Sequence, residues 1–183
     1  MKRCRHSYGF GIQSPWAYQF DRFTVNEHAP YYSYEDLRKK MPDLGDDQRK
    51  LLELYFRCTN YRQPQNILYY GNDFEPFSAY CHCGCSRAKI HSFGDSSLPS
   101  VSHIDMLFVS PVRNYRDDCL QLLDALDEQS MLVFESINEN KETKQFWREL
   151  VDDSRTGVTF DLYYCGIIFF DKKRYKEKYV INF

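Results

Sequence analysis

From residue 64 onward, short apolar runs alternate with amphipathic stretches, and this alternation constrains the fold more than any other feature. "NILYY", "HIDMLFVS" and "MLVFES" have the composition of buried strands, whereas "YRDDCLQLLDAL" has the spacing of a helix. Strands that alternate with helices of this length are typical of parallel βαβ units. The sequence therefore predicts an α/β fold with a mostly parallel sheet.

The two ends of the chain follow other patterns. "GVTFDLYYCGIIFF" predicts a hairpin that turns at Tyr164 to Gly166, and "KYVINF" predicts a last strand, so we expect a mixed sheet. Near the N-terminus, apolar residues recur at helical spacing behind Pro15. We expect a single domain over 1–183, with a helical extension at 1–63 and a Rossmann-like core at 64–183.

Composition and charge exclude several classes of partner. The 183 residues are 43% hydrophobic and 27% charged, which is typical of a globular protein. A net charge of −2 gives no electrostatic case for binding nucleic acid. No apolar stretch approaches the length of a membrane span, and the basic N-terminus lacks the apolar run of a signal peptide. We expect a cytoplasmic protein whose seven cysteines stay reduced.

The order of the predicted elements resembles that of class I S-adenosylmethionine-dependent methyltransferases. "DDSRTGVTFDLYYCGIIFFDKK" is most similar to the closing hairpin of small-molecule O-methyltransferases. "RHSYGFGIQSPWAYQF" and "KYVINF" are similar to a bacterial branch of methyltransferase-like proteins. The resemblance covers essentially the whole chain. It implies a doubly wound, mostly parallel sheet with an antiparallel C-terminal hairpin, and S-adenosylmethionine as the cofactor.

The family's cofactor loop is altered in this sequence. In the family, the first strand runs into an acidic, Gly-rich loop that wraps the methionine part of the cofactor. Here the strand ends at Gly71, and Asn72 and Asp73 follow in place of further glycines. Asn72 or Asp73 can adopt a positive φ or bind a ligand amine, so the resemblance makes these three residues candidates for cofactor binding. Alternatively, the segment is a simple turn in which Asp73 caps the next helix.

Two further positions of the family pattern have been replaced. In the family, the acid that binds the ribose lies near the position of Phe93. Asp95 lies two residues later and either takes this role in a rearranged loop or is an ordinary turn residue. Ser110 and Pro111 stand where metal-dependent relatives carry an Asp, and Glu135 is the remaining carboxylate after the following strand. We therefore add Asp95 and Ser110 to the predicted cofactor site, expect no metal site, and assign no catalytic residue.

The remaining candidates each have an ordinary structural alternative. Arg113 and Tyr115 follow a predicted strand and either point into the ligand cleft or begin the next helix. His6 and His28 are candidate bases within an N-terminal covering segment. The run "CHCGC" has the metal-binding residue type but lacks a second pair of ligands, and it also reads as a helix end capped by Gly84.

Three functions are compatible with this sequence. The first is methyl transfer from S-adenosylmethionine to a small molecule, with a remodelled cofactor loop. The second is a degenerate relative that binds a protein or small-molecule partner without chemistry. The third and weakest is a cysteine-rich metal or redox protein. The sequence does not identify the methyl acceptor, and it leaves a homo-oligomer open.

Overall fold

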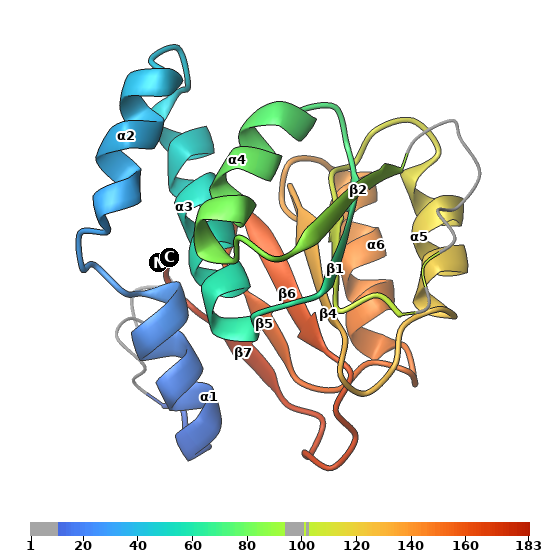
Figure 1. The fold of residues 1–183 in the computed structure, drawn as a ribbon. Coiled ribbons are helices and arrows are strands. Elements are labelled where there is room, and N and C mark those ends of the chain that lie inside the picture. The colour runs from blue at the N-terminus through green and yellow to red at the C-terminus, as the bar shows by residue number, and fades with distance from the viewer. Residues whose placement is uncertain (1–10, 94–100, 102) are drawn as a thin grey trace. The chain divides into compact units, whose positions relative to one another are not determined.

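The computed structural model describes residues 11–93, 101 and 103–183. These residues form two compact units. The first unit contains Asn66–Asn72 and Lys89–Phe183, and it holds the whole sheet (Figure 1). The second unit contains residues 11–65 and Asp73–Ala88, and its described elements are all helices. No helix among the described residues is long and apolar enough to cross a membrane.

A seven-stranded sheet forms the first unit, with the strand order β2-β1-β3-β4-β6-β5-β7. Strands β1 to β4 are parallel, whereas β6 runs antiparallel to its neighbours β4 and β5. The predicted mixed α/β sheet with an antiparallel C-terminal hairpin is confirmed. The strands are β1 Asn66–Tyr70, β2 Lys89–Phe93, β3 Met106–Val109, β4 Met131–Glu135, β5 Thr159–Asp161, β6 Cys165–Phe169 and β7 Lys178–Val180.

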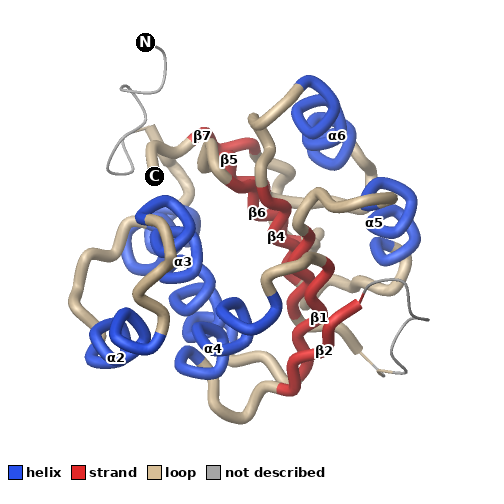
Figure 2. Tube along the Cα trace, turned by 90° about the horizontal axis from the view of Figure 1, so that it is seen from above, coloured by secondary structure: helices blue, strands red, loops and turns tan. Residues whose placement is uncertain are grey.

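Helices α5 (Tyr115–Leu123) and α6 (Lys141–Asp152) lie on the same side of the strands (Figure 2). A capping box between Asn140 and Thr143 starts α6. The apolar face of each helix packs on alternate strand residues. The rings of Tyr115, Phe134 and Phe146 meet there, with centroids 5.4 to 5.8 Å apart. Aromatic residues make up 17% of the chain, and part of this content is therefore core.

The hairpin turns earlier than the sequence predicts. Cys165 and Gly166 already belong to β6, where they pair with β4. The turn lies at residues 162–164, where Tyr163 takes a φ of 76°. Gly166 is not a turn residue, because Trp147 of α6 packs directly on it. A Cβ at position 166 would lie 2.3 Å from Cη2 of Trp147, so only glycine leaves room for this ring.

The second unit begins with α1 (Pro15–Phe20), which has Pro15 at its first position, as predicted. The side chain of Ser14 caps this helix. The other helices are the π-helix η2 (Asp21–Val25), α2 (Tyr32–Lys40), α3 (Asp46–Arg62) and α4 (Phe74–Gly84).

Helices α3 and α4 approach each other closely at Gly84. A Cβ at this position would lie 2.4 Å from the Phe56 carbonyl oxygen of α3. The prediction that Gly84 caps the helix is wrong, because Gly84 is the last helical residue and Cys85 is the cap, in an extended conformation. Glycine is required here by close packing between two helices.

Candidate cofactor site

The strand order changes direction between β1 and β3. The chain passes from β1 to β2 on one side and then returns to place β3 on the other side of β1. In open α/β sheets, ligands bind outside the carboxyl ends of the strands at this switch point. Tyr70 and Val109 pair at the carboxyl ends of β1 and β3, so Gly71 and Ser110 follow at the same edge. This edge of the first unit is therefore the candidate site.

Ser110 is bound to both of its neighbouring strands. Its amide donates to the Tyr70 carbonyl oxygen at 2.7 Å, and its hydroxyl donates to the carboxylate of Glu135 at the end of β4. Ser110 and Glu135 are both half-buried. The bond therefore ties the ends of β3 and β4 together and orients a carboxylate at the edge of the sheet.

Gly71 is covered on one side by Tyr69. A Cβ at position 71 would lie 2.5 Å from the Tyr69 hydroxyl oxygen and 3.0 Å from Cβ of Ser110. Residues two apart on a strand face the same side, so the Tyr69 ring extends along the sheet and reaches over Gly71. The Tyr69 side chain is only 2% exposed. The internal contact with Tyr69 is thus sufficient to require glycine here. We call Tyr69, Gly71, Ser110 and Glu135 the switch-point cluster.

The other predicted cofactor residues are placed differently. Asn72 is exposed at the end of its segment of the first unit, whereas Asp73 belongs to the second unit. Asp73 lies at the N-cap of α4, but its side chain makes no capping hydrogen bond and instead accepts one from Gln48 at 3.3 Å. Neither Asn72 nor Asp73 has a positive φ. Asp95 lies outside the described residues.

Comparison with known proteins bears on the fold. No family model matches the sequence, and no curated protein matches it. A methyltransferase from Podospora anserina bound to S-adenosylhomocysteine (SAH) matches 85% of this chain and 93% of its own, with a TM-score of 0.58 and 13% identity. The chain has the fold of the S-adenosylmethionine-dependent methyltransferases.

Two further solved structures support the methyltransferase fold. The O-methyltransferase from Bacillus cereus in complex with SAH covers 83% of this chain and 94% of its own, with a TM-score of 0.53 and 10% identity. A methyltransferase from Geobacter sulfurreducens covers 79% of this chain and 92% of its own, with a TM-score of 0.53 and 13% identity. At these identities the likeness establishes the fold and leaves the activity to be argued from the site.

The loop after β4 of the methyltransferase fold is tied to the hairpin turn. The Ser136 amide donates to the Tyr164 carbonyl oxygen at 2.7 Å, and Ser136 has a φ of 54°. The Asn138 side chain donates to the Tyr163 carbonyl oxygen at 3.1 Å.

Over the described part of the chain, no three His, Cys, Asp or Glu side chains are grouped to hold a metal ion.

Tyr115 begins the next helix, whereas Arg113 lies on the surface two residues before it, so neither matches in full the predicted role of a surface residue at the helix start. Tyr115 is the first residue of α5 and is buried against Phe134 and Phe146, and this burial raises the pKa of its hydroxyl. Arg113 is exposed, and its carbonyl oxygen lies 2.6 Å from the Tyr70 hydroxyl.

His28 is exposed and belongs to the second unit, and His6 lies outside the described residues.

The cysteine cluster lies at the end of α4 in the second unit. All six described cysteines are free thiols. Cys81 and Cys85 are buried, whereas Cys83 is exposed. Burial raises the pKa of the Cys81 thiol well above its ordinary value, and it raises the pKa of nearby Cys58 to about 12. Buried thiols with raised pKa values are poor nucleophiles, which leaves Cys83 as the most accessible thiol of this run.

Proposed function

We propose that this chain binds S-adenosylmethionine at the switch-point cluster and transfers its methyl group to a small molecule. The observation that carries the proposal is the position of Gly71, Ser110 and Glu135, at the carboxyl ends of adjacent parallel strands where the order of the sheet reverses. Two solved relatives with this fold were crystallised with SAH, and one of them is an O-methyltransferase.

The residues at this edge fit the polar groups of the cofactor. S-adenosylmethionine carries an ammonium group, a carboxylate and two ribose hydroxyls. A carboxylate has about four acceptor sites, so Glu135 can accept from a ligand ammonium or hydroxyl as well as from Ser110. The exposed Asn72 offers an amide that both donates and accepts. These side chains are the ones that would hold the cofactor in the first unit.

The chemistry asks little of the protein beyond positioning. When bound, the cofactor supplies an electrophilic methyl group. The protein then has to hold the methyl acceptor in line with this group and exclude water, and such positioning alone contributes several kcal/mol, of the order of 7–11 in well-oriented systems. A base is not needed when the acceptor is already a nucleophile. We therefore assign binding roles at the switch-point cluster and no catalytic residue.

Isothermal titration with S-adenosylmethionine and with SAH tests this proposal. Ser110→Leu fills the edge with an apolar side chain, and Ser154→Leu is its matched control, because exposed Ser154 lies in the loop before β5, toward the opposite end of the strands. We expect micromolar binding to the wild type and to Ser154→Leu, with loss of binding in Ser110→Leu. Gly71→Val is a poor test, since its side chain would clash with Tyr69 whether or not a ligand binds.

A second function, partner binding without methyl transfer, is favoured by the contact between Tyr69 and Gly71. In this alternative, the Tyr69 ring occupies the space that a Gly-rich loop would leave for the cofactor. Tyr69→Leu shortens the ring that covers Gly71. If the wild type gives no heat with the cofactor and folded Tyr69→Leu does, the site is closed by Tyr69, and the second function is the better account.

A further inference from the structure

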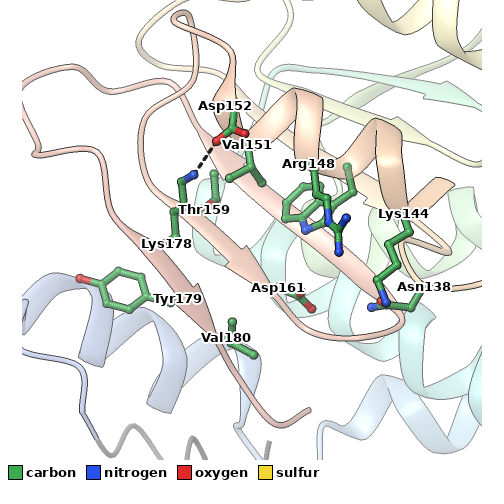
Figure 3. Close-up of a pocket in the computed structure, with 11 residues that line it drawn as sticks. Asn138, Lys144, Arg148, Val151, Asp152, Thr159, Asp161, Lys178, Tyr179 and Val180 are labelled. Atoms are coloured by element: carbon green, nitrogen blue, oxygen red, sulfur yellow. Dashed lines mark hydrogen bonds and ion pairs between the residues drawn. The ribbon is translucent and has the colours of Figure 1, made fainter. Parts of the chain in front are cut away.

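A cavity lies in the first unit, at the far end of the sheet from β1. It has a volume of about 290 Å³ and is bounded by α6 and by the strands β5 and β7 (Figure 3). Strands β3, β4 and β6 separate β1 from β5 in the sheet, so this cavity is separate from the switch-point cluster. Small-molecule pockets typically begin at about 300 Å³, so the cavity suits a small metabolite better than a nucleotide.

One face of α6 forms the wall of the cavity. Lys144, Trp147, Arg148 and Val151 all line it. Their spacing of i, i+3, i+4 and i+7 places them on one side of a helix. Trp147 is held in place because its ring packs on Gly166 of β6. The wall therefore presents two flexible cationic side chains beside a rigid apolar surface.

Alternate residues of two strands form the floor. Thr159 and Asp161 of β5 face the same side, and they pair in register with Lys178 and Val180 of β7. The intervening Tyr179 ring points away from the cavity in Figure 3, and it stacks on the ring of Phe160. The floor thus combines a carboxylate, a hydroxyl and an apolar methyl surface.

The charges around the cavity lie in three places. At one end Lys178 is paired with Asp152, with Nζ and Oδ1 2.5 Å apart (Figure 3). On the wall Lys144 and Arg148 are exposed, and they form no ion pair with any described carboxylate. Asp161 on the floor accepts a hydrogen bond from the Tyr163 amide at 3.0 Å. A ligand in the cavity therefore meets two cations on one side and a carboxylate on another.

We propose that this cavity binds a free α-amino acid with an apolar or aromatic side chain. Its carboxylate pairs with Lys144 and Arg148, since an arginine fork matches a carboxylate in geometry and charge. Its ammonium group is bound by the carboxylate of Asp161. Its side chain lies on Trp147 and Val151, which form the apolar part of the wall. This site does not depend on cofactor binding at the switch-point cluster.

Three related probes separate the two charged contacts. L-phenylalanine carries both charges, 3-phenylpropionate carries only the carboxylate, and L-phenylalaninamide carries only the ammonium. Titration followed by two-dimensional amide NMR and by tryptophan fluorescence measures each affinity. We expect L-phenylalanine to bind with a millimolar or lower Kd, and each probe that lacks one charge to bind about tenfold more weakly.

Variants of α6 test whether the wall recognises the carboxylate. We expect Arg148→Gln and Lys144→Gln each to weaken the binding of L-phenylalanine by about tenfold and to leave the affinity for L-phenylalaninamide unchanged. Lys141→Gln is the matched control, because Lys141 is an exposed lysine of the same helix that does not line the cavity.

Three results overturn the proposal. In the first, none of the probes binds the folded wild type at millimolar concentration. In the second, 3-phenylpropionate binds as tightly as L-phenylalanine, which removes the role of Asp161. In the third, Lys141→Gln weakens the binding of L-phenylalanine as much as Arg148→Gln does. Loss of S-adenosylmethionine binding in Ser110→Leu reports on the switch-point cluster alone, so failure here is distinguishable from failure of the proposed methyl-transfer function.

Discussion

The switch-point cluster and the cavity beside α6 lie in the same sheet but differ in how their side chains are satisfied. At the switch point, the Ser110 hydroxyl is bound to Glu135, and Tyr69 covers Gly71. Beside α6, Lys144 and Arg148 line a cavity and pair with no described carboxylate. The first region is placed by the fold where ligands usually bind, whereas the second is marked by open space and unbalanced charge.

This difference separates two kinds of evidence for a binding site. Topology predicts the switch point, because the ends of parallel strands leave a crevice where the order of the sheet reverses. A ligand there must compete with hydrogen bonds that the protein already makes to itself, which lowers the net gain of each new bond. The cavity beside α6 has no support from topology, but among its cationic side chains only Lys178 forms an ion pair with a described carboxylate, that of Asp152.

The largest effect is expected where Trp147 packs on Gly166. Gly166→Ala places a methyl group inside the volume of the indole ring, and we expect a loss of about 2–3 kcal/mol in the free energy of unfolding. Urea denaturation measures this loss. Gly45→Ala is the control, because a Cβ there meets nothing within 4 Å, and its effect should stay within about 0.5 kcal/mol. Equal stability of the two variants would show that Trp147 does not form the wall as described.

A smaller loss is expected at the switch point from Gly71→Ala. We expect about 1–2 kcal/mol without any cofactor, because the new methyl group meets the Tyr69 hydroxyl. In a Tyr69→Leu background the same substitution should cost less, giving a coupling energy above about 0.5 kcal/mol in a double-mutant cycle. Additive effects would mean that Tyr69 is not the reason for glycine at position 71. The switch point would then no longer differ from the cavity in being covered by a protein side chain.

Ser110→Ala should cost about 1–2 kcal/mol in the free energy of unfolding, because it removes a hydrogen bond to a half-buried carboxylate. In a Glu135→Gln background the cost should fall, since a neutral amide is the weaker acceptor. The two urea denaturation curves give this comparison directly. If the cost of Ser110→Ala is the same in both backgrounds, the Ser110 hydroxyl is not bonded to Glu135, and the switch-point cluster is wrong as described.

The smallest effect concerns the pH dependence of the pair that closes one end of the cavity. The hydrogen bond and positive charge of Lys178 lower the pKa of Asp152 below its ordinary value of 3.8. A carboxyl with a lowered pKa stabilises the folded state above its unfolded pKa, and this contribution is lost as the pH falls through the folded value. Lys178→Gln should move the Asp152 pKa back toward 3.8 in a carboxyl NMR titration. Because Asp152 is exposed, salt should reduce the shift, and an unchanged pKa would contradict the pairing.

The sequence predicted the fold well because the hydrophobic periods are local. The buried runs became β1, β3 and β4, and the two halves of "GVTFDLYYCGIIFF" became the antiparallel pair β5 and β6. The errors came from glycines. Gly84 and Gly166 were predicted to mark a helix cap and a turn, yet both make room for a residue distant in sequence. Which side chain packs on a glycine depends on tertiary structure, and no local pattern carries that information.

The candidate site was predictable in part. Parallel strands bring their carboxyl ends to one edge, so the sequence could place Gly71 and Ser110 together. The direction of the Tyr69 ring could not be predicted, because it depends on packing. The spacing of Lys144, Trp147 and Arg148 indicates a shared helix face, but this spacing does not predict a cavity. Recognising it requires the strand order that places β5 and β7 beside α6.

The measurement that tests the central claim most directly is calorimetric titration of the wild-type protein with S-adenosylmethionine, run beside Ser110→Leu and Ser154→Leu. The account predicts a micromolar Kd for the wild type and for Ser154→Leu, and no measurable heat for Ser110→Leu. Absence of heat from the folded wild type at millimolar cofactor would contradict it, as would equal binding by all three proteins.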